Sequence, residues 1–205
     1  MTPEQIDALA WDKMDGLLPT VVQDHATGQV LMLGYMDRTA LEKTLEGGKV
    51  TFFSRSKQRL WTKGETSGNT LDLVSVSPDC DSDALLVRAV PNGPTCHLGT
   101  TSCFGSEGPT GLAFLAQLSR VVAMRADDPA EESYTAQLLA EGREKIAQKI
   151  GEEGVEVALA AVTRDDDGLT DELADLAYHI AVLLQARGLS WDDIGERLRK
   201  RHATD

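Results

Sequence analysis

Three cysteines in the first half of the chain are the residues best suited to hold a transition metal. Cys80, Cys96 and Cys103 are the only cysteines among the 205 residues. Structural zinc sites usually use four ligands in two close pairs, whereas three thiolates leave the fourth tetrahedral position open for water. The spacing therefore suits a catalytic zinc site, and three unrelated buried cysteines are an equally good alternative.

Alternating aspartates around the first cysteine add a second candidate metal site. In an extended segment, Asp79, Asp81 and Asp83 point to one side of the backbone and Cys80 points to the other. Carboxylate oxygens are the ligands that Mg²⁺ takes in proteins, so one short segment can serve two metals. A calcium loop is rejected, because no glycine turn follows the aspartates and Val90 occupies the twelfth loop position.

Carboxylates also gather in the second half, at spacings that bring them onto neighbouring helical turns. They are Glu152, Glu153, Glu156, Glu172 and Asp175. At about 100° per residue, Glu172, Asp175 and His179 share an arc of roughly 60° next to apolar positions. Acids crowded beside a core need a compensating cation, and Mg²⁺ is the ordinary one. Salt-bridged surface acids are the alternative.

The first half of the chain is rich in short apolar runs separated by turn residues, which predicts an α+β, strand-rich domain with mostly antiparallel pairing. Gly47-Gly48 should end its longer helix. The expected elements are a short helix over 6–11, a hairpin of strands 18–22 and 30–33, a helix over 39–45, and strands 50–53, 71–76 and 84–90.

The second half shows apolar residues at three- and four-residue steps, which predicts an all-α helical bundle. The expected helices are 112–124, 133–164, 170–187 and a short last helix that begins at Ser190 with a capping-type start. The Gly- and Pro-containing run over 104–111 suits a connection between domains. We therefore expect one domain over 1–107 and a second over 112–205.

Composition narrows the class of partner. A formal net charge of -13 argues against a nucleic-acid polymer, because phosphate contacts need clustered Lys and Arg. A small anionic ligand is compatible with this charge if bound divalent metals and local basic residues meet its phosphates. The N-terminal residues lack a secretory signal and no apolar run approaches membrane-spanning length, so a cytoplasmic protein is expected.

The carboxylate motifs of the second half resemble those of a known family. Glu152-Glu-Gly-Val-Glu156 followed by Glu172-Leu-Ala-Asp-Leu-Ala-Tyr-His179 is similar to the all-helical phosphoribosyl-ATP pyrophosphohydrolases, over residues 112–203. The resemblance implies hydrolysis between the α and β phosphates, with release of pyrophosphate and Mg²⁺ held by the five carboxylates named above. Lys145 and Lys149, one turn apart, are candidate phosphate contacts, and solvated helix lysines are the alternative.

The motifs of the first half resemble phosphoribosyl-AMP cyclohydrolase over residues 17–105. The matching segments are Thr27-Gly-Gln-Val-Leu-Met32, Tyr35-Met36, Phe53-Ser-Arg-Ser56, Trp61-Thr-Lys-Gly-Glu-Thr-Ser-Gly68, Asp79-Cys-Asp-Ser-Asp83 and Gly99-Thr-Thr-Ser-Cys-Phe104. The family implies Zn²⁺ on the three cysteines, Mg²⁺ on the three aspartates, and a homodimer whose zinc sites take cysteines from both chains. One departure is Asp37, where the family pattern has Asn.

Zinc in such a site lowers the pKa of bound water, which suits attack on C6 of an adenine activated at N1. His97 is the candidate for proton transfer, with a structural histidine as the alternative. The candidate phosphate contacts are Arg55, Lys63, Ser67 and Gly68. Trp61 is a candidate to stack on a base, although core packing is at least as good an explanation.

Together the two resemblances imply a bifunctional hydrolase of histidine biosynthesis, with phosphoribosyl-ATP and phosphoribosyl-AMP as its small-molecule substrates. The second domain converts phosphoribosyl-ATP to phosphoribosyl-AMP, and the first opens the adenine ring between N1 and C6. One alternative is a general nucleotide-sanitising pyrophosphohydrolase with a non-catalytic zinc dimerisation module. Another is a metal-stabilised interaction protein without catalysis.

Overall fold

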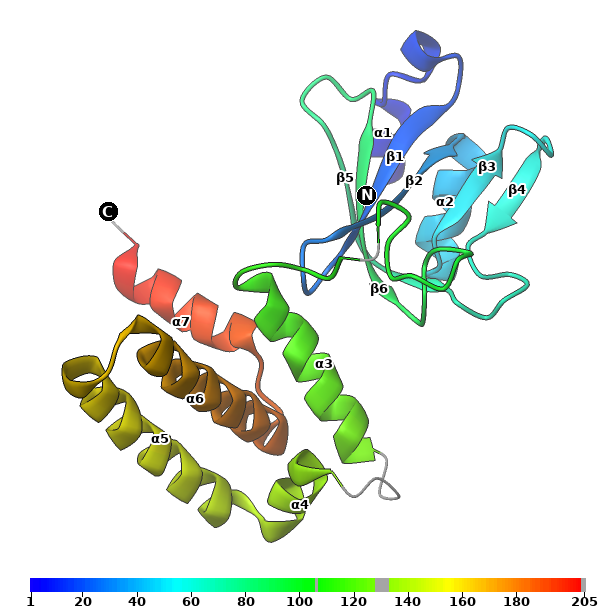
Figure 1. Ribbon diagram of the computed structural model, residues 1–205. Coiled ribbons are helices and arrows are strands. Elements are labelled where there is room, and N and C mark those ends of the chain that lie inside the picture. The colour runs from blue at the N-terminus through cyan, green and yellow to red at the C-terminus, as the bar shows by residue number, and fades with distance from the viewer. Residues whose placement is uncertain (106, 128–132, 204–205) are drawn as a thin grey trace. The chain divides into compact units, whose positions relative to one another are not determined.

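The computed structural model describes residues 1–105, 107–127 and 133–203 (Figure 1). The chain divides into two units, Met1–Ala113 and Phe114–Asp205, each with its own hydrophobic core. The first unit contains all the described strands, and the second is helical. This confirms the predicted fold class, a strand-rich α+β unit followed by an all-α unit.

Two sheets and two helices make up most of the first unit. In chain order its elements are α1 (Pro3–Asp7), the 3₁₀ turn η1 (Trp11–Met14), β1 (Leu18–Asp24), β2 (Val30–Met36), α2 (Arg38–Gly47), β3 (Thr51–Ser54), β4 (Arg59–Thr62), β5 (Leu71–Pro78) and β6 (Leu85–Pro91). The prediction of one short helix over 6–11 was wrong, because the chain turns after Asp7 and forms a 3₁₀ turn from Trp11 onward. Strand β4 was not predicted.

The larger sheet has the strand order β2-β1-β6-β5. Strands β1 and β2 form the predicted antiparallel hairpin, β6 pairs parallel to β1, and β5 pairs antiparallel to β6. Strands β3 and β4 form a separate antiparallel hairpin. Alternate residues of β1 are buried, among them Leu18 and Val22, so one face of the sheet packs on the core with Leu41 of α2 and Phe52 of β3.

Helix α2 has a defined residue at each end. The Asp37 carboxylate accepts a hydrogen bond from the Ala40 N–H at 2.7 Å, and Gly48 ends the helix in the left-handed conformation, with φ of 64°. Asp and Asn are both strong N-cap residues, because each presents a side-chain oxygen to the free N–H groups of the first turn. The aspartate at position 37, where the family pattern has Asn, therefore has a structural role that either residue can fill.

Five helices form the described part of the second unit. They are α3 (Ala113–Asp127), α4 (Tyr134–Glu141), α5 (Arg143–Thr163), α6 (Asp166–Arg187) and α7 (Trp191–His202). The predicted capping start of α7 is confirmed, since the Ser190 hydroxyl accepts from the Asp193 N–H and the Asp193 carboxylate accepts from the Ser190 N–H. Within the described residues, no helix is both long and apolar enough to cross a membrane.

The prediction of one continuous helix over 133–164 was wrong, because Gly142 interrupts it. Gly142 has φ of 94° and ψ of 179°, a conformation that essentially only glycine adopts, and it separates α4 from α5. The apolar periodicity continues across the break, so the pattern alone predicts a single helix. The core of the unit lies between α3, α4, α5 and α6, around Val122, Leu138, Ile146 and Val182.

Candidate active sites

A cavity of about 440 Å³ in the first unit brings together half of the residues predicted for ring opening. Its predicted lining residues are Trp61, Lys63, Ser67, Cys96, His97 and Cys103. They come from β4, from the loop that follows it, and from the segment after β6. Segments far apart in the sequence therefore meet around two of the three cysteines.

The segment that carries the two thiols is fastened to strand β2. The Cys103 N–H donates to the Leu31 carbonyl at 2.8 Å, and the Ser102 hydroxyl donates to the Val30 carbonyl, also at 2.8 Å. At its other end, the Cys96 N–H donates to the Thr100 carbonyl at 3.0 Å. These bonds hold both thiols on one ordered loop beside the sheet.

The buried lysine of the cavity shares its surroundings with the thiols. Lys63 is 7% exposed, and its ammonium donates to the Asn69 carbonyl at 3.1 Å. Burial lowers the pKa of Lys63, against an opposing effect of Cys103 and Cys96. The Leu98 N–H and then the Thr100 side chain lower the pKa of Cys96, whereas burial and then the Cys96 charge raise the pKa of Cys103. The cavity thus offers sulfur ligands with a cation nearby.

Other residues of this cavity have distinguishable roles. The Trp61 ring stacks on Phe52 with 5.8 Å between centroids, so it packs on the core and lines the cavity as well. The exposed His97 places Nδ1 3.9 Å from Cys96 Sγ. The Thr95 hydroxyl, which the sequence interpretation missed, is buried and has no hydrogen-bond partner among the described residues. A buried, unpaired hydroxyl on a cavity wall suits a polar ligand.

Besides the three aspartates, three predicted residues lie outside this cavity as far as the described lining shows. Cys80 is exposed on the turn between β5 and β6. The Arg55 guanidinium lies over the Tyr35 ring, 3.8 Å from its centroid. Gly68 closes a turn in which its N–H donates to the Gly64 carbonyl at 2.9 Å. Within one chain, the structure therefore brings together two of the proposed thiol ligands and separates the third.

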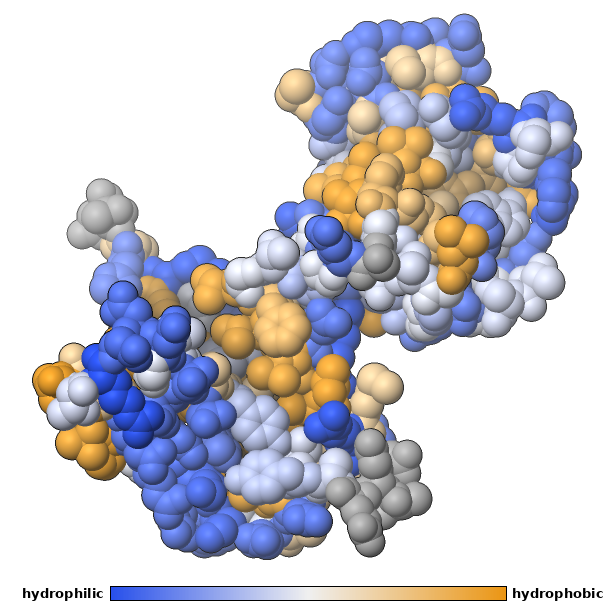
Figure 2. All heavy atoms as spheres, in the orientation of Figure 1, coloured by the Kyte–Doolittle hydropathy of each residue, from blue (hydrophilic) through white to orange (hydrophobic). Residues whose placement is uncertain are grey.

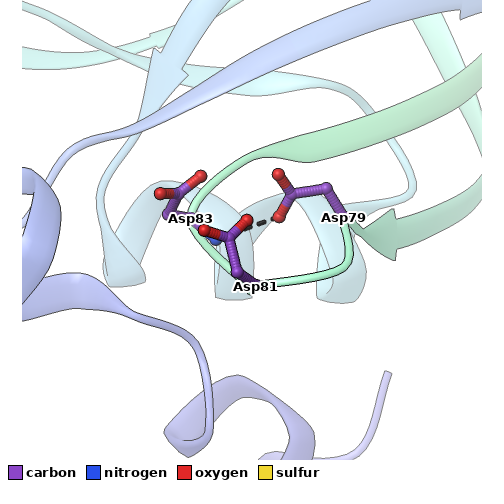
Figure 3. Close-up of side chains that lie close together, drawn as sticks. All are labelled: Asp79, Asp81 and Asp83. Carbon is purple, nitrogen blue, oxygen red and sulfur yellow. Dashed lines mark hydrogen bonds between the residues drawn. The ribbon is translucent and has the colours of Figure 1, made fainter.

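The aspartate cluster occupies the β5–β6 turn (Figure 3). The expectation of an extended segment was wrong, because the chain must reverse here and Ser82 adopts a left-handed φ of 62°. The turn is held by Asp79, whose carboxylate accepts from the N–H groups of Asp83 at 3.0 Å and Ala84 at 3.2 Å. Even so, Asp79, Asp81 and Asp83 each place a carboxylate oxygen within 4.8 Å of the others.

A lysine from the 3₁₀ turn already supplies a cation to these aspartates. The Lys13 ammonium lies 2.5 Å from Asp81 Oδ2 and also contacts the Asp83 carboxylate. The hydrogen bond from Lys13 lowers the pKa of Asp81, and the two aspartates raise the pKa of Lys13. Lys13 stands 68 residues from Asp81 in the sequence, so no local pattern predicted this contact.

Helices α5 and α6 build the second carboxylate cluster. Glu153 and Glu156 of α5 and Glu172 of α6 each place an oxygen within 4.8 Å of the others. Glu153 is 6% exposed and Glu172 is 8% exposed. The charges of Glu153 and Glu172 raise the pKa of Glu156, because like charges disfavour its ionised form. Two buried carboxylates and an exposed third that they repel fit a divalent cation with oxygen ligands.

The other predicted residues of the second unit lie at the margin of this cluster. Glu152 pairs with the Lys149 ammonium at 2.9 Å and accepts from the Gln148 amide at 2.7 Å. Asp175 is exposed, and the Lys145 ammonium donates to Gln148 at 3.4 Å. The structure thus joins three of the five predicted carboxylates directly and leaves Glu152 and Asp175 beside them.

Two contacts of this cluster were not predicted from the sequence. Arg164, at the end of α5, forms an ion pair with Glu172. On the buried side, His179 of α6 lies against Glu153, and its ring also contacts the Tyr134 hydroxyl. Tyr134 and Arg164 lie outside the carboxylate motifs, so only the helix packing reveals that they belong to the site.

Comparison with protein families finds two consecutive matches. The family model described as Phosphoribosyl-AMP cyclohydrolase matches residues 32–105, which include the thiol cavity and the aspartate turn. The family model described as Phosphoribosyl-ATP pyrophosphohydrolase matches residues 115–202, which include the glutamate cluster.

Relatives that match almost the whole chain share one name, "Histidine biosynthesis bifunctional protein HisIE". The relative from Escherichia coli strain K12 is 59% identical over 202 residues, which are 98% of this chain and 99% of the relative. The relative from Shewanella oneidensis is 56% identical over 203 residues, 98% of this chain and 94% of the relative. The relative from Photobacterium profundum is 56% identical over 202 residues, 96% and 98% of the two chains.

Proposed function

We propose roles for these residues on the premise that the chain belongs to the family of bifunctional histidine biosynthesis proteins. Its activities are those of a phosphoribosyl-ATP pyrophosphohydrolase and a phosphoribosyl-AMP cyclohydrolase. The first activity releases pyrophosphate from phosphoribosyl-ATP, and the second opens the adenine ring of the phosphoribosyl-AMP that remains. The order of the domains is therefore opposite to the order of the reactions.

We assign residues 1–107 to ring opening and residues 112–205 to pyrophosphate release. Support comes from the division of the chain between Ala113 and Phe114 and from the two family matches on either side of it. Because the first unit matches a cyclohydrolase, a non-catalytic zinc module beside a general pyrophosphohydrolase is not retained.

Magnesium in the second unit is the counterion that we propose for the glutamate cluster. Glu153, Glu156 and Glu172 form its centre, with Glu152 and Asp175 completing the set from the same two helices. When bound, Mg²⁺ neutralises phosphate charge and orients water for in-line attack. The mutual repulsion that raises the pKa of Glu156 supports this assignment, since a divalent cation relieves it.

Phosphate recognition in the second unit is proposed for two lysines of α5. Lys149 lies beside Glu152 at 2.9 Å, and Lys145 lies one turn earlier on the same helix. Their ammonium groups supply positive charge next to an otherwise acidic cluster, which suits the oxygens of a triphosphate.

In the first unit, the thiol cavity is the proposed site of ring opening, with Cys96 and Cys103 as zinc ligands. When bound, Zn²⁺ supplies a Lewis acid that lowers the pKa of a ligated water. The lowered pKa of Cys96 supports a thiolate role for it. His97, exposed on the cavity wall, is placed to hold or move a proton during attack at C6 and opening of the N1–C6 bond.

Substrate binding in this cavity is assigned to residues of its walls. Lys63 and Ser67 present an ammonium and a hydroxyl to the cavity, and Trp61 offers a ring face to the adenine. Arg55 and Gly68 lie outside the described lining, so we assign them to phosphate at its rim. The Asp79, Asp81 and Asp83 oxygens fit Mg²⁺ as hard ligands, with Lys13 as a competing cation.

A homodimer is proposed because Cys80 is separated from the other two thiols within one chain. A partner chain that contributes its Cys80 completes the three-cysteine set. Apolar surface supports the same conclusion: Figure 2 shows apolar side chains gathered over β1, β2 and β5, where Leu33 and Val74 are exposed. On α5, Leu159 and Val162 are exposed on one face near the end of the helix.

The cytoplasm is the proposed compartment. The three free thiols support it, because a reducing environment keeps zinc-binding cysteines available as thiolates.

The test of the function follows both products of the intact protein. Purified protein incubated with phosphoribosyl-ATP, Mg²⁺ and Zn²⁺ should release pyrophosphate first and the ring-opened chromophore afterwards. The same protein given phosphoribosyl-AMP should form the chromophore without pyrophosphate. Consumption of dITP or dCTP while phosphoribosyl-ATP stays intact is the result that would reject the assignment.

A further inference from the structure

A line of three side chains runs from helix α4 to the glutamate cluster. The Tyr134 hydroxyl lies 3.2 Å from His179 Nε2, and His179 Nδ1 lies 3.5 Å from Glu153 Oε1. His179 is 5% exposed, so the histidine that links Tyr134 to the cluster is shielded from water. A buried polar side chain between a cluster carboxylate and a second helix is positioned to control where that carboxylate points.

The hydrogen-bond partners of His179 decide which ring nitrogen carries a proton. Nδ1 faces two acceptors, the Asp175 carbonyl at 2.9 Å and the Glu153 carboxylate at 3.5 Å, so Nδ1 must carry hydrogen. The Tyr134 hydroxyl then donates to the unprotonated Nε2 of the neutral ring. The Nδ1–H donates to the Asp175 carbonyl at 2.9 Å, and Glu153 Oε1 lies against the same nitrogen at 3.5 Å. A Glu153 oxygen also lies within 4.8 Å of oxygens of Glu156 and Glu172.

The neighbouring residues show that this geometry depends on the first turn of α4. The Thr135 and Tyr178 hydroxyls are 2.7 Å apart, which gives α4 and α6 a second side-chain hydrogen bond next to the first. The His179 ring meets the Tyr178 ring edge-on, with 5.2 Å between centroids. The imidazole is therefore held by packing and by hydrogen bonds on both nitrogens, and it has little freedom to turn away from Glu153.

We propose that His179 is a positioning residue for the metal site: its imidazole, held by the Asp175 carbonyl and the Tyr134 hydroxyl, lies against Glu153 and limits where that carboxylate can point. The inference rests on the proposed Mg²⁺ role of Glu153, Glu156 and Glu172. It adds α4 to the elements that determine metal affinity, although no residue of α4 belongs to the carboxylate cluster. Groups that hold metal ligands in place typically contribute about 10- to 100-fold to metal affinity or activity.

The test measures metal binding by the full chain without substrate, with Mn²⁺ as the probe and its electron paramagnetic resonance signal as the readout. His179→Phe keeps the ring shape but loses both nitrogens, and should weaken Mn²⁺ binding in the second unit about 10- to 100-fold. His179→Asn keeps an N–H donor close to the position of Nδ1, and should recover most of the affinity. Tyr134→Phe removes only the distal hydroxyl and should cause a smaller loss than His179→Phe.

Tyr178→Phe is the matched control. It removes a hydroxyl that joins the same two helices through Thr135 but that is not part of the line from Tyr134 to Glu153. It should change Mn²⁺ affinity far less than His179→Phe does. Far-ultraviolet circular dichroism of every variant checks that the helices are intact. In the pyrophosphate assay, His179→Phe should need more Mg²⁺ for half-maximal rate and should recover its rate at high Mg²⁺.

Each outcome decides the inference. It is overturned if His179→Phe binds Mn²⁺ like the unchanged protein, or if Tyr178→Phe loses as much affinity as His179→Phe. Glu156→Gln distinguishes failure of the His179 proposal from failure of the proposed metal role of the glutamate cluster. If the cluster binds the metal, Glu156→Gln should remove the Mn²⁺ site of the second unit. If Glu156→Gln leaves that site intact, the glutamate cluster does not hold the metal and both proposals fall.

Discussion

The aspartate cluster of the first unit lies on a solvent-exposed turn, whereas the glutamate cluster of the second unit lies on two facing helices with Glu153 and Glu172 buried. On the turn, water screens the charges and a nearby lysine balances them. Between the helices, screening is weaker, and the charges of Glu153 and Glu172 raise the pKa of Glu156. A change at the buried cluster should therefore have a larger effect than a change beside the exposed one.

The sulfur ligands give the comparison a second aspect. The second unit brings three carboxylates together within one chain, but the first unit leaves Cys80 apart from the cavity that contains Cys96 and Cys103. Under the proposal that a partner chain supplies its Cys80, ring opening should depend on pairing of two chains.

The largest expected effect is a complete separation of the two activities. Glu156→Ala should reduce pyrophosphate release by more than about a hundredfold, because it removes a proposed metal ligand and not a residue that only positions a ligand. It should leave ring opening of supplied phosphoribosyl-AMP intact. Cys96→Ala should do the reverse. Rates of the two half-reactions are measured separately on each variant. Loss of both activities in either variant, with the fold intact, would contradict the independence of the two units.

Complementation tests the shared thiol site. Cys80→Ala and Cys96→Ala should each be inactive in ring opening, but their co-expression should restore about a quarter of the normal activity, because half of randomly formed dimers are mixed and each mixed dimer keeps one intact site of two. The ring-opened chromophore is the readout. Co-expression of Cys96→Ala with Cys103→Ala is the matched control and should restore no activity. In the proposed arrangement one chain supplies both Cys96 and Cys103 to a site, so every site of a mixed dimer lacks one of the two. Equal inactivity of both mixtures would argue against thiols from two chains.

A smaller effect is expected at the exposed turn. Lys13→Met removes the cation that contacts Asp81 and Asp83, so it should lower the Mg²⁺ concentration needed for half-maximal ring opening, by roughly two- to fivefold for a solvent-screened ion pair. Titration of the ring-opening rate with Mg²⁺ measures this change. Arg38→Met is a suitable control, because Arg38 pairs with Asp7 outside the cluster. A higher Mg²⁺ requirement in Lys13→Met would mean that the lysine supports the site instead of competing for it.

The smallest expected effect concerns the fold alone. Asp37→Asn should leave the free energy of unfolding nearly unchanged, whereas Asp37→Ala should lower it by about 1 kcal/mol, because only alanine loses the N-cap of α2. Chemical unfolding of the full chain followed by circular dichroism measures the difference. A marked loss of ring-opening activity in Asp37→Asn would instead connect this position to the chemistry.

Local signals predicted the elements that end in recognisable residues. The β1–β2 hairpin, the end of α2 at Gly48 and the capped start of α7 at Ser190 all follow from turn and cap preferences that act over a few residues. Strand β4 was missed because Arg59–Thr62 is short, pairs with β3 alone among the described strands, and has no fully buried residue. Its sequence therefore shows no alternation of buried and exposed positions.

The candidate sites were predictable only where they are encoded in motifs. Carboxylate and cysteine spacing identified residues that the fold does bring together, such as Glu153 with Glu172 and Cys96 with Cys103. Lys13 and Tyr134 reach their sites through tertiary packing and carry no local sequence signal. The separation of Cys80 from Cys96 and Cys103 could not be predicted from the sequence spacing of the cysteines either, because that spacing does not reveal the direction of the β5–β6 turn.

The break at Gly142 makes one codon unusually vulnerable. The backbone conformation of Gly142 is one that essentially only glycine adopts. This residue also separates the end of α4 from the start of α5. Every missense change of a glycine codon by a single base introduces a side chain. Such a mutation would spare all the carboxylates and still disturb the helix that brings Tyr134 to His179. In a genetic screen for histidine auxotrophs, position 142 should therefore appear among the loss-of-function alleles although it contributes no functional group.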